Sequence, residues 1–180
     1  MKIYFTRHGE TPWNRLDNIC GRTDLPLTDK GIRQAEELAE RLPDGIGHIL
    51  VSPLLRAQQT AAPCATRLGL TPVTDERLRE WDYGDFEGKH RTAPGYMEAK
   101  LEFGVRMPHG ESVFDLAGRV YPLLQEIPKK YDKDVLIVAH GGICRIIEAY
   151  ARGMTREQFA DFYMGNCELR SFDPEDIWNC

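Results

Sequence analysis

Apolar residues along this chain follow two spacings: short continuous runs, and longer stretches with a helical repeat. The runs IYF (3–5), HILVS (48–52) and DVLIVA (134–139) have the length of strands. The last is apolar almost throughout, which is typical of a strand covered on both faces. TPVTD (71–75) predicts a short strand, and CELRSF (167–172) predicts a last one.

Between these runs, apolar residues recur at the three- and four-residue spacing of one helix face. The pattern predicts helices over 28–42, 53–69, 111–127 and 142–153, whereas 76–95 has no clean period and predicts an ordered loop. The residues expected to face inward are Ile32, Ala35, Leu38, Ala39 and Leu42 in the first helix, Leu55, Ala62 and Leu68 in the second, and Val113, Leu116, Val120, Leu124 and Ile127 in the third.

Helix boundaries and breaks also have local signals. Thr28 is a suitable N-cap for the first helix, and Ser52 with Pro53 forms an N-cap and first-turn pair before the second. Pro63 lies inside the second helix and is expected to kink or interrupt it. The TREQ stretch at 155–158 matches a capping box.

Strands that alternate with helices predict a mainly parallel α/β sheet with helices on both faces, which is a three-layer α/β/α sandwich. The 180 residues suit one domain, and no internal repeat or linker divides them. We therefore expect a single domain over residues 1–180. In such sheets, ligands bind at the carboxyl ends of the strands.

Charged and polar residues follow three of the predicted strands directly. Arg7 and His8 follow the first strand, Arg56 comes shortly after the second, and His140 follows DVLIVA. A glycine comes after each histidine, which lets the backbone turn sharply and approach a ligand closely. We expect these side chains to face one shared crevice.

This set of side chains suits a phosphate group. The guanidinium groups of Arg7 and Arg56 offer forked donors to phosphate oxygens. A neutral imidazole is a competent nucleophile toward phosphorus, and the phosphohistidine could pass its phosphoryl group to water. The leaving alkoxide needs a proton, for which a carboxylic acid is suited. Chemistry alone does not choose among four candidate acids in LREWDYGDFEG: Glu80, Asp82, Asp85 and Glu87.

Six stretches of the chain resemble the motif series of a known family. In chain order they are TRHGETPWN, GRTDLPLTDKGIRQA, SPLLRAQQTA, LREWDYGDFEG, PHGES and VAHGG. Together they resemble the histidine phosphatase superfamily, also called the phosphoglycerate mutase-like family. The resemblance implies a three-layer α/β sandwich. It also implies an enzyme that hydrolyses phosphate monoesters, and we expect it to need no metal ion or other cofactor.

The resemblance further implies a role for seven residues. His8 would be the nucleophile that carries the phosphoryl group, and Glu80 would be the proton donor. The other five would complete the phosphate pocket: Arg7, Asn14, Arg56, His140 and Gly141. Asn14 would donate through its side-chain amide and Gly141 through its backbone N–H.

Two departures from the cofactor-dependent phosphoglycerate mutases of this family favour a phosphatase. Those mutases have extra segments over the active site, whereas the stretch between Glu87 and Pro108 is short here. A mutase must keep water out while its intermediate is reoriented. The mutases also carry a tryptophan where this chain has Arg22. The stretch GRTDLPLT looks closest to small bacterial phosphatases, including the α-ribazole-5'-phosphate type, and a phosphoglycerate mutase is the alternative function.

Composition and charge argue against several classes of binding partner. The net charge is −5 without a lysine or arginine cluster, which argues against nucleic acid and anionic membranes. No run approaches a membrane span and the N-terminus is too short in apolar residues for a signal peptide, so we expect a cytoplasmic protein. The five cysteines contain no C-x-x-C pair, which disfavours a disulfide framework or a structural zinc site.

The expected partner is a small-molecule phosphate ester, and the sequence leaves open both its identity and whether the chain forms a homo-oligomer. α-Ribazole phosphate, a sugar phosphate, phosphoglycerate and a phosphoprotein are all open as substrates. The loop from Trp81 to Pro108 should shape that choice. His109 could line the substrate mouth without a catalytic role. Tyr83 is expected to pack, although a loop aromatic near the pocket could also stack on a base or sugar.

Overall fold

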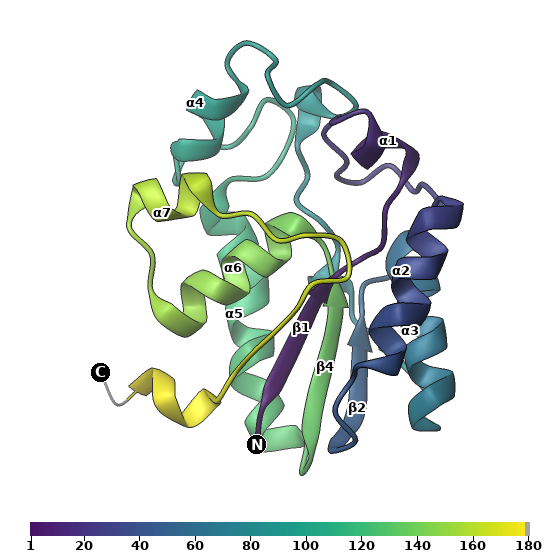
Figure 1. Ribbon diagram of the computed structural model, residues 1–180. Coiled ribbons are helices and arrows are strands. Elements are labelled where there is room, and N and C mark those ends of the chain that lie inside the picture. The colour runs from purple at the N-terminus through teal and green to yellow at the C-terminus, as the bar shows by residue number, and fades with distance from the viewer. Residues whose placement is uncertain (179–180) are drawn as a thin grey trace.

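A five-stranded sheet forms the centre of the computed structural model, which describes residues 1–178 (Figure 1). In spatial order its strands are β3 (Val73–Thr74), β2 (Ile46–Val51), β4 (Asp134–Ala139), β1 (Ile3–Arg7) and β5 (Leu169–Phe172). The first four are parallel, and β5 pairs antiparallel with β1. The predicted mainly parallel sheet is therefore confirmed, with one antiparallel strand at its edge.

Helices cover both faces of this sheet and give the predicted three layers (Figure 1). α2 (Asp29–Glu40) and α3 (Leu55–Leu68) pack on one face, and α5 (Val113–Lys130) and α6 (Gly141–Arg152) pack on the other. Each face of the sheet therefore has its own apolar core, and β4 contributes alternate side chains to the two cores.

Several short helical segments lie outside the four long helices. α1 (Pro12–Arg15) and α4 (Tyr96–Leu101) lie beyond those ends, in regions where the apolar pattern predicts no helix (Figure 1). α7 (Arg156–Asp161) begins at the predicted capping box, in which Thr155 and Gln158 bond each other's backbone N–H groups. The remaining segments are 3₁₀ turns: η1 (Glu76–Leu78), η2 (Gly84–Phe86) and η3 (Pro174–Trp178).

Side-chain burial follows the predicted helical pattern in α5 but not in α3. All five residues of α5 that were expected to face inward are buried. In α3, by contrast, Leu55 and Ala62 are exposed, and Ile32 of α2 is exposed as well. The buried face of α3 consists of Arg56, Ala57, Thr60, Ala61, Cys64 and Ala65. Because this face consists of small and polar side chains, the spacing of large apolar residues did not predict it.

The start of α3 also differs from the prediction. The N-cap residue is Leu54, which makes no side-chain cap, so Ser52 does not begin the helix. The Ser52 hydroxyl lies 2.6 Å from His140 Nε2 instead. Pro63 does not interrupt α3, because residues 55–68 form one continuous helix.

Two findings concern chemistry away from the candidate site. The described cysteines Cys20, Cys64, Cys144 and Cys167 are buried free thiols, and Cys180 lies outside the described residues. No helix within residues 1–178 is long and apolar enough to cross a membrane.

Candidate active site

The two histidines that follow apolar runs lie side by side because β1 and β4 are neighbours in the sheet. Arg7 at the end of β1 is in register with Ala139 at the end of β4, and the His8 N–H donates to the Ala139 carbonyl at 3.0 Å. The ring centroids of His8 and His140 are 5.2 Å apart. The predicted convergence at one sheet end is therefore observed.

The His8 ring is held in one tautomer. Its Nδ1 lies 2.7 Å from the Gly9 carbonyl oxygen, so Nδ1 carries the proton and Nε2 keeps its lone pair. The Nε–H of Arg56 donates to this Nε2 at 3.2 Å. Burial, and then the charges of Arg56 and Arg7, hold the pKa of His8 well below 6.5. His8 is thus neutral at pH 7 and has its free lone pair on the nitrogen that faces Arg56.

Arg56 is fully buried on α3 and is fixed by the backbone around it. Its Nη1 donates to the Thr23 carbonyl at 2.9 Å, and its Nη2 donates to the Gly21 carbonyl at 2.7 Å. Both carbonyls belong to the loop between α1 and α2. The loop therefore sets the position of a guanidinium group directly beside the nucleophile candidate.

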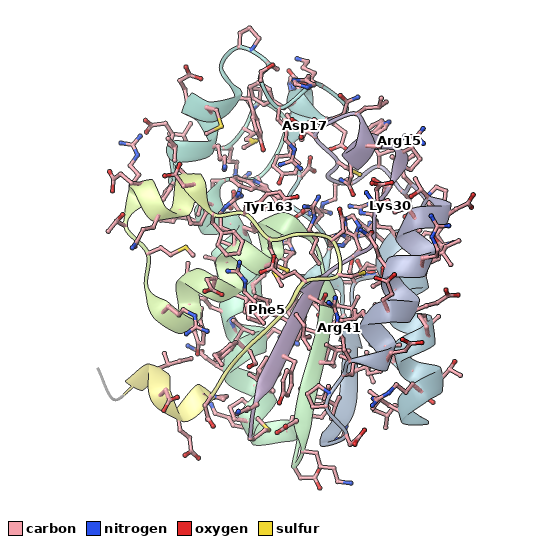
Figure 2. All side chains as sticks on the ribbon, in the orientation of Figure 1. Phe5, Arg15, Asp17, Lys30, Arg41 and Tyr163 are labelled. Atoms are coloured by element: carbon pink, nitrogen blue, oxygen red, sulfur yellow. The ribbon has the colours of Figure 1, made fainter. Side chains whose placement is uncertain are left out.

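Arg7 is also buried, and only one end of its guanidinium group is bound. Its Nη1 donates to the Met164 carbonyl at 3.0 Å, whereas its Nε has no hydrogen-bond partner among residues 1–178. The ring of Tyr163 lies 5.8 Å from the Arg7 guanidinium carbon. Tyr163 belongs to the segment after α7, beyond the carboxyl end of the strand that carries Phe5 (Figure 2).

His140 presents an unused nitrogen. Its Nε2 bonds the Ser52 hydroxyl, and its buried Nδ1 has no hydrogen-bond partner in the described part of the chain. Burial, and then the charge of Arg56, hold the pKa of His140 well below 6.5. If the Ser52 hydroxyl donates to Nε2, Nδ1 carries the proton of the neutral ring and is a donor without an acceptor.

Glu80 is the candidate acid that the structure brings to this place. It lies between η1 and η2, and its two carboxyl oxygens accept the N–H groups of Trp81 at 2.8 Å and Gly142 at 3.0 Å. Gly142 is in the first turn of α6, so a helix N-terminus faces the carboxyl group.

The other three acids bond elsewhere. Asp82 accepts the Gly84 N–H, Asp85 pairs with His109, and Glu87 accepts the Gly21 and Thr23 N–H groups. None of the three lines the cavity described next.

A polar cavity opens at this end of the sheet. Five of the seven residues predicted for the site line it: Arg7, His8, Asn14, Glu80 and Gly141. Arg56 and His140 do not line the cavity, but each contacts His8, which does. Asn14 is held by its Oδ1, which accepts the Thr11 N–H at 3.1 Å and the Asn166 amide at 3.3 Å.

Sequence reasoning missed several residues of the cavity. Tyr83 lines it together with Tyr96, although packing was the first expectation for Tyr83, and Arg91 and Arg145 also line it. No local motif distinguishes these two arginines from surface ones. His109 does not line the cavity: it is exposed and has a left-handed φ of 59°.

Comparison with known proteins identifies the family. Residues 3–177 match the family described as the histidine phosphatase superfamily, branch 1. The chain belongs to this superfamily. The predicted family and enzyme class, a phosphatase, are confirmed at this level. The narrower likeness to the α-ribazole-5'-phosphate type stays a prediction.

Similar members of the histidine phosphatase superfamily carry different names. The probable phosphoglycerate mutase GpmB of Yersinia pestis (strain Pestoides F) is 35% identical over 187 residues, covering 98% of this chain and 86% of that protein. The mycobacterial glucosyl-3-phosphoglycerate phosphatase Rv2419c, solved with VO3, has a TM-score of 0.84 at 32% identity, covering 94% of this chain and 91% of that one. The protein TTHB049 of Thermus thermophilus has a TM-score of 0.78 at 32% identity, covering 97% of this chain and 94% of that one.

Proposed function

We propose that this protein hydrolyses phosphate monoesters through a phosphohistidine intermediate on His8, with Glu80 as proton donor and without a metal ion. The observation that carries the proposal is a neutral imidazole whose unprotonated Nε2 accepts the Nε–H of Arg56, while His8 and Glu80 line the same cavity. A nucleophile, a cation and an acid thus surround one space, as phosphoryl transfer needs.

The phosphate group binds to donors that have no acceptor among the described residues. Arg7 Nε and His140 Nδ1 are buried and unpartnered within residues 1–178, and Gly141, the first residue of α6, lines the cavity. A phosphate oxygen takes the place of His8 Nε2 as acceptor of the Arg56 Nε–H, which frees the lone pair of the nucleophile while Arg56 keeps its bonds to the Gly21 and Thr23 carbonyls. Asn14 adds its amide. These donors stabilise the charge that spreads over the phosphoryl oxygens in the transition state.

Two displacements then complete the reaction. In the first, His8 Nε2 forms a bond to phosphorus while the ester P–O bond breaks, and Glu80 gives its proton to the leaving oxygen. In the second, a water molecule attacks phosphorus and the N–P bond breaks, and the Glu80 carboxylate takes the proton of the water. Inorganic phosphate is released and His8 is again neutral.

Arginines take the part that a metal ion has in many phosphatases. The positive charges near His8 come from Arg7 and Arg56, and residues 1–178 hold no group of three or more His, Cys, Asp or Glu side chains that could bind a metal ion. Activity on an aryl phosphate should therefore persist with a chelator present. Complete loss of turnover under chelation would contradict this part of the proposal.

The direct test is to detect the intermediate. Enzyme that is turning over ³²P-labelled substrate and is quenched in alkaline detergent should carry label on His8 that is stable in base and lost in acid. His8→Asn should lose at least about 10³-fold in kcat. The matched control is His109→Asn, which removes an exposed imidazole outside the cavity and should leave kcat unchanged. Full activity of His8→Asn would refute the mechanism.

A phosphoglycerate mutase is the second candidate, and the name of the Yersinia relative favours it. Both reactions share the phosphohistidine step and differ in which molecule accepts the phosphoryl group. The short stretch between Glu87 and Pro108 favours water as the acceptor. Interconversion of 3- and 2-phosphoglycerate in the presence of 2,3-bisphosphoglycerate, faster than phosphate release, would decide for the mutase.

A further inference from the structure

The segment between α7 and β5 passes over the end of β1 and is tied to it by hydrogen bonds (Figure 1). The Cys167 N–H donates to the Arg7 carbonyl at 2.8 Å, and the Thr6 hydroxyl donates to the Glu168 carbonyl at 2.8 Å. Cys167 has a left-handed φ of 56°, which is uncommon for a residue other than glycine. The turn held in this way places Asn166 beside the stretch that follows β1.

A single NH2 group on the Asn166 side chain serves two acceptors. Its Nδ2 lies 2.8 Å from the His8 carbonyl oxygen and 3.3 Å from Asn14 Oδ1. Because the group carries two hydrogens, it donates to both acceptors at once. His8 and Asn14 line the cavity, whereas Asn166 does not. Any effect of Asn166 on the reaction is therefore expected to pass through these two residues.

The first acceptor belongs to the peptide group that follows the nucleophile. Both polar atoms of this His8–Gly9 peptide are bonded: Asn166 donates to the carbonyl, and the N–H donates to the buried Thr60 hydroxyl at 3.0 Å. The next carbonyl, that of Gly9, accepts the Nδ1–H of His8. A fixed His8–Gly9 peptide thus keeps in place the acceptor that leaves Nε2 unprotonated.

The second acceptor decides which way the amide of Asn14 points. Asn14 Oδ1 accepts the Thr11 N–H at 3.1 Å and the Asn166 amide at 3.3 Å, so two donors hold the oxygen end. The end that remains for the cavity is the Nδ2 group, which is a donor. A reversed amide would instead direct the lone pairs of Oδ1 at an anion.

We propose that Asn166 is a positioning residue, whose one NH2 group both directs the Asn14 amide toward the phosphate and holds the peptide after His8. The inference rests on the proposed function, because it assigns a role in the phosphate pocket of that reaction. Asn166 lies 158 residues from His8 along the chain and 152 from Asn14, so the contact depends on how β5 returns to the edge of β1.

Binding of inorganic phosphate tests the action on Asn14 without turnover. Calorimetry should show that Asn14→Ala lowers phosphate affinity about tenfold, the scale of one hydrogen bond to a charged group. Asn166→Ala should lower it about three- to tenfold, because Asn14 keeps its amide but loses its fixed direction. In the Asn14→Ala background the same change should lower affinity less than about twofold, since the two residues act as a unit. An equal loss in both backgrounds, or no loss in either, would overturn the proposal.

Asn166→Asp separates the direction of the Asn14 amide from the simple loss of a bond. A carboxylate at 166 only accepts, so it should turn the Asn14 NH2 group toward itself and direct Oδ1 at the phosphate. Phosphate affinity should then fall at least about threefold further than in Asn166→Ala, and the Asn14→Ala background should remove most of this extra loss. If the extra loss persists there in full, the added charge alone explains it and the orienting role is wrong.

A matched control uses another asparagine of the same region. Asn18 is half-buried, as Asn166 is, and does not line the cavity. Asn18→Ala should therefore leave phosphate affinity and kcat unchanged. A loss in this variant as large as in Asn166→Ala would mean that the region responds to any lost amide, which refutes a specific role for Asn166.

Turnover tests the action on the nucleophile. In the Asn14→Ala background, Asn166→Ala should still lower kcat about tenfold, because the peptide after His8 loses a donor while phosphate affinity hardly changes. An unchanged kcat would refute this half of the proposal. If no ester is hydrolysed but the coupling in phosphate binding is found, the phosphatase proposal fails and the orienting role of Asn166 stands. Hydrolysis without that coupling refutes only the orienting role.

Discussion

At the scale of single residues, an added methyl group at Gly142 is expected to disturb the candidate proton donor Glu80. A Cβ atom there would lie 2.5 Å from Glu80 Oε1 and 3.3 Å from the Trp81 Cβ. Glu80 cannot simply move away, because the N–H groups of Trp81 and Gly142 hold both of its oxygens. A methyl group at 142 must therefore displace the acid from the place where the leaving oxygen needs it.

Gly142→Ala should consequently lower kcat about 10- to 100-fold, since a shift of about 1 Å in a catalytic group costs that much. The matched control is Gly118→Ala in α5, where an added Cβ meets no atom within 4 Å. It should leave kcat unchanged and raise the free energy of unfolding by about 1 kcal/mol, because alanine is the better helix former. Steady-state kinetics and urea unfolding of both variants check this, and normal kcat in Gly142→Ala would show that Glu80 is not held as described.

Single residues also show what the sequence can and cannot predict about the site. Arg7, His8 and His140 could be placed because each follows an apolar run, and neighbouring parallel strands end at the same edge. Ser52 and Asn166 could not, since their roles depend on which residues of other elements face them. Arg56 was predicted as a site residue, but its full burial was not expected. The helix face that carries it is buried, whereas Leu55, which was expected to face inward, is exposed.

At the scale of elements, α5 holds the segment that carries Glu80. Arg119 of α5 donates to the Glu80 carbonyl at 3.2 Å and to the Glu111 carboxylate at 3.1 Å. Glu111, just before α5, accepts the Asp82 N–H at 3.0 Å and the Trp81 indole N–H at 2.9 Å. Burial opposes ionisation of Glu111, but the hydrogen bond and charge of Arg119 outweigh it and leave its pKa below the usual value. The Arg119–Glu111 pair thus fixes the backbone at the acid and just after it.

Arg119→Gln should therefore impair the chemical step more than substrate binding. We expect kcat to fall about 10- to 100-fold with KM changed less, because Glu80 acts on the leaving oxygen rather than on the bound phosphate. Arg106→Gln is the control: Arg106 pairs with Asp115 at 2.9 Å on the exposed side of the same region, and this change should leave kcat and KM unchanged. The value of kcat/KM reports the first displacement alone, and an equal loss of it for a substrate with a good leaving group such as p-nitrophenol, which needs no acid, would refute a role through Glu80.

At the scale of the whole molecule, the buried histidines couple the stability of the fold to pH. Burial, and then Arg56, depress the pKa of both His8 and His140 well below 6.5 in the folded protein. In the unfolded chain the same two side chains take up protons at about pH 6.5. Below that pH the unfolded state binds up to two more protons than the folded state, so the free energy of unfolding rises with pH and falls on acidification.

We expect the free energy of unfolding to drop by about 2–4 kcal/mol between pH 7 and pH 5, since each proton contributes about 1.4 kcal/mol per pH unit. His109 acts in the opposite sense, because Asp85 raises its pKa, so the measurement is made in a His109→Asn background. Urea unfolding across this pH range gives the slope of the free energy of unfolding against pH. Adding His140→Asn should reduce this slope by the amount that corresponds to one proton, whatever the variant's stability at pH 7. An unchanged slope in that variant would mean that His140 titrates normally, and that the cations around the phosphate site do not keep their imidazole neighbours neutral.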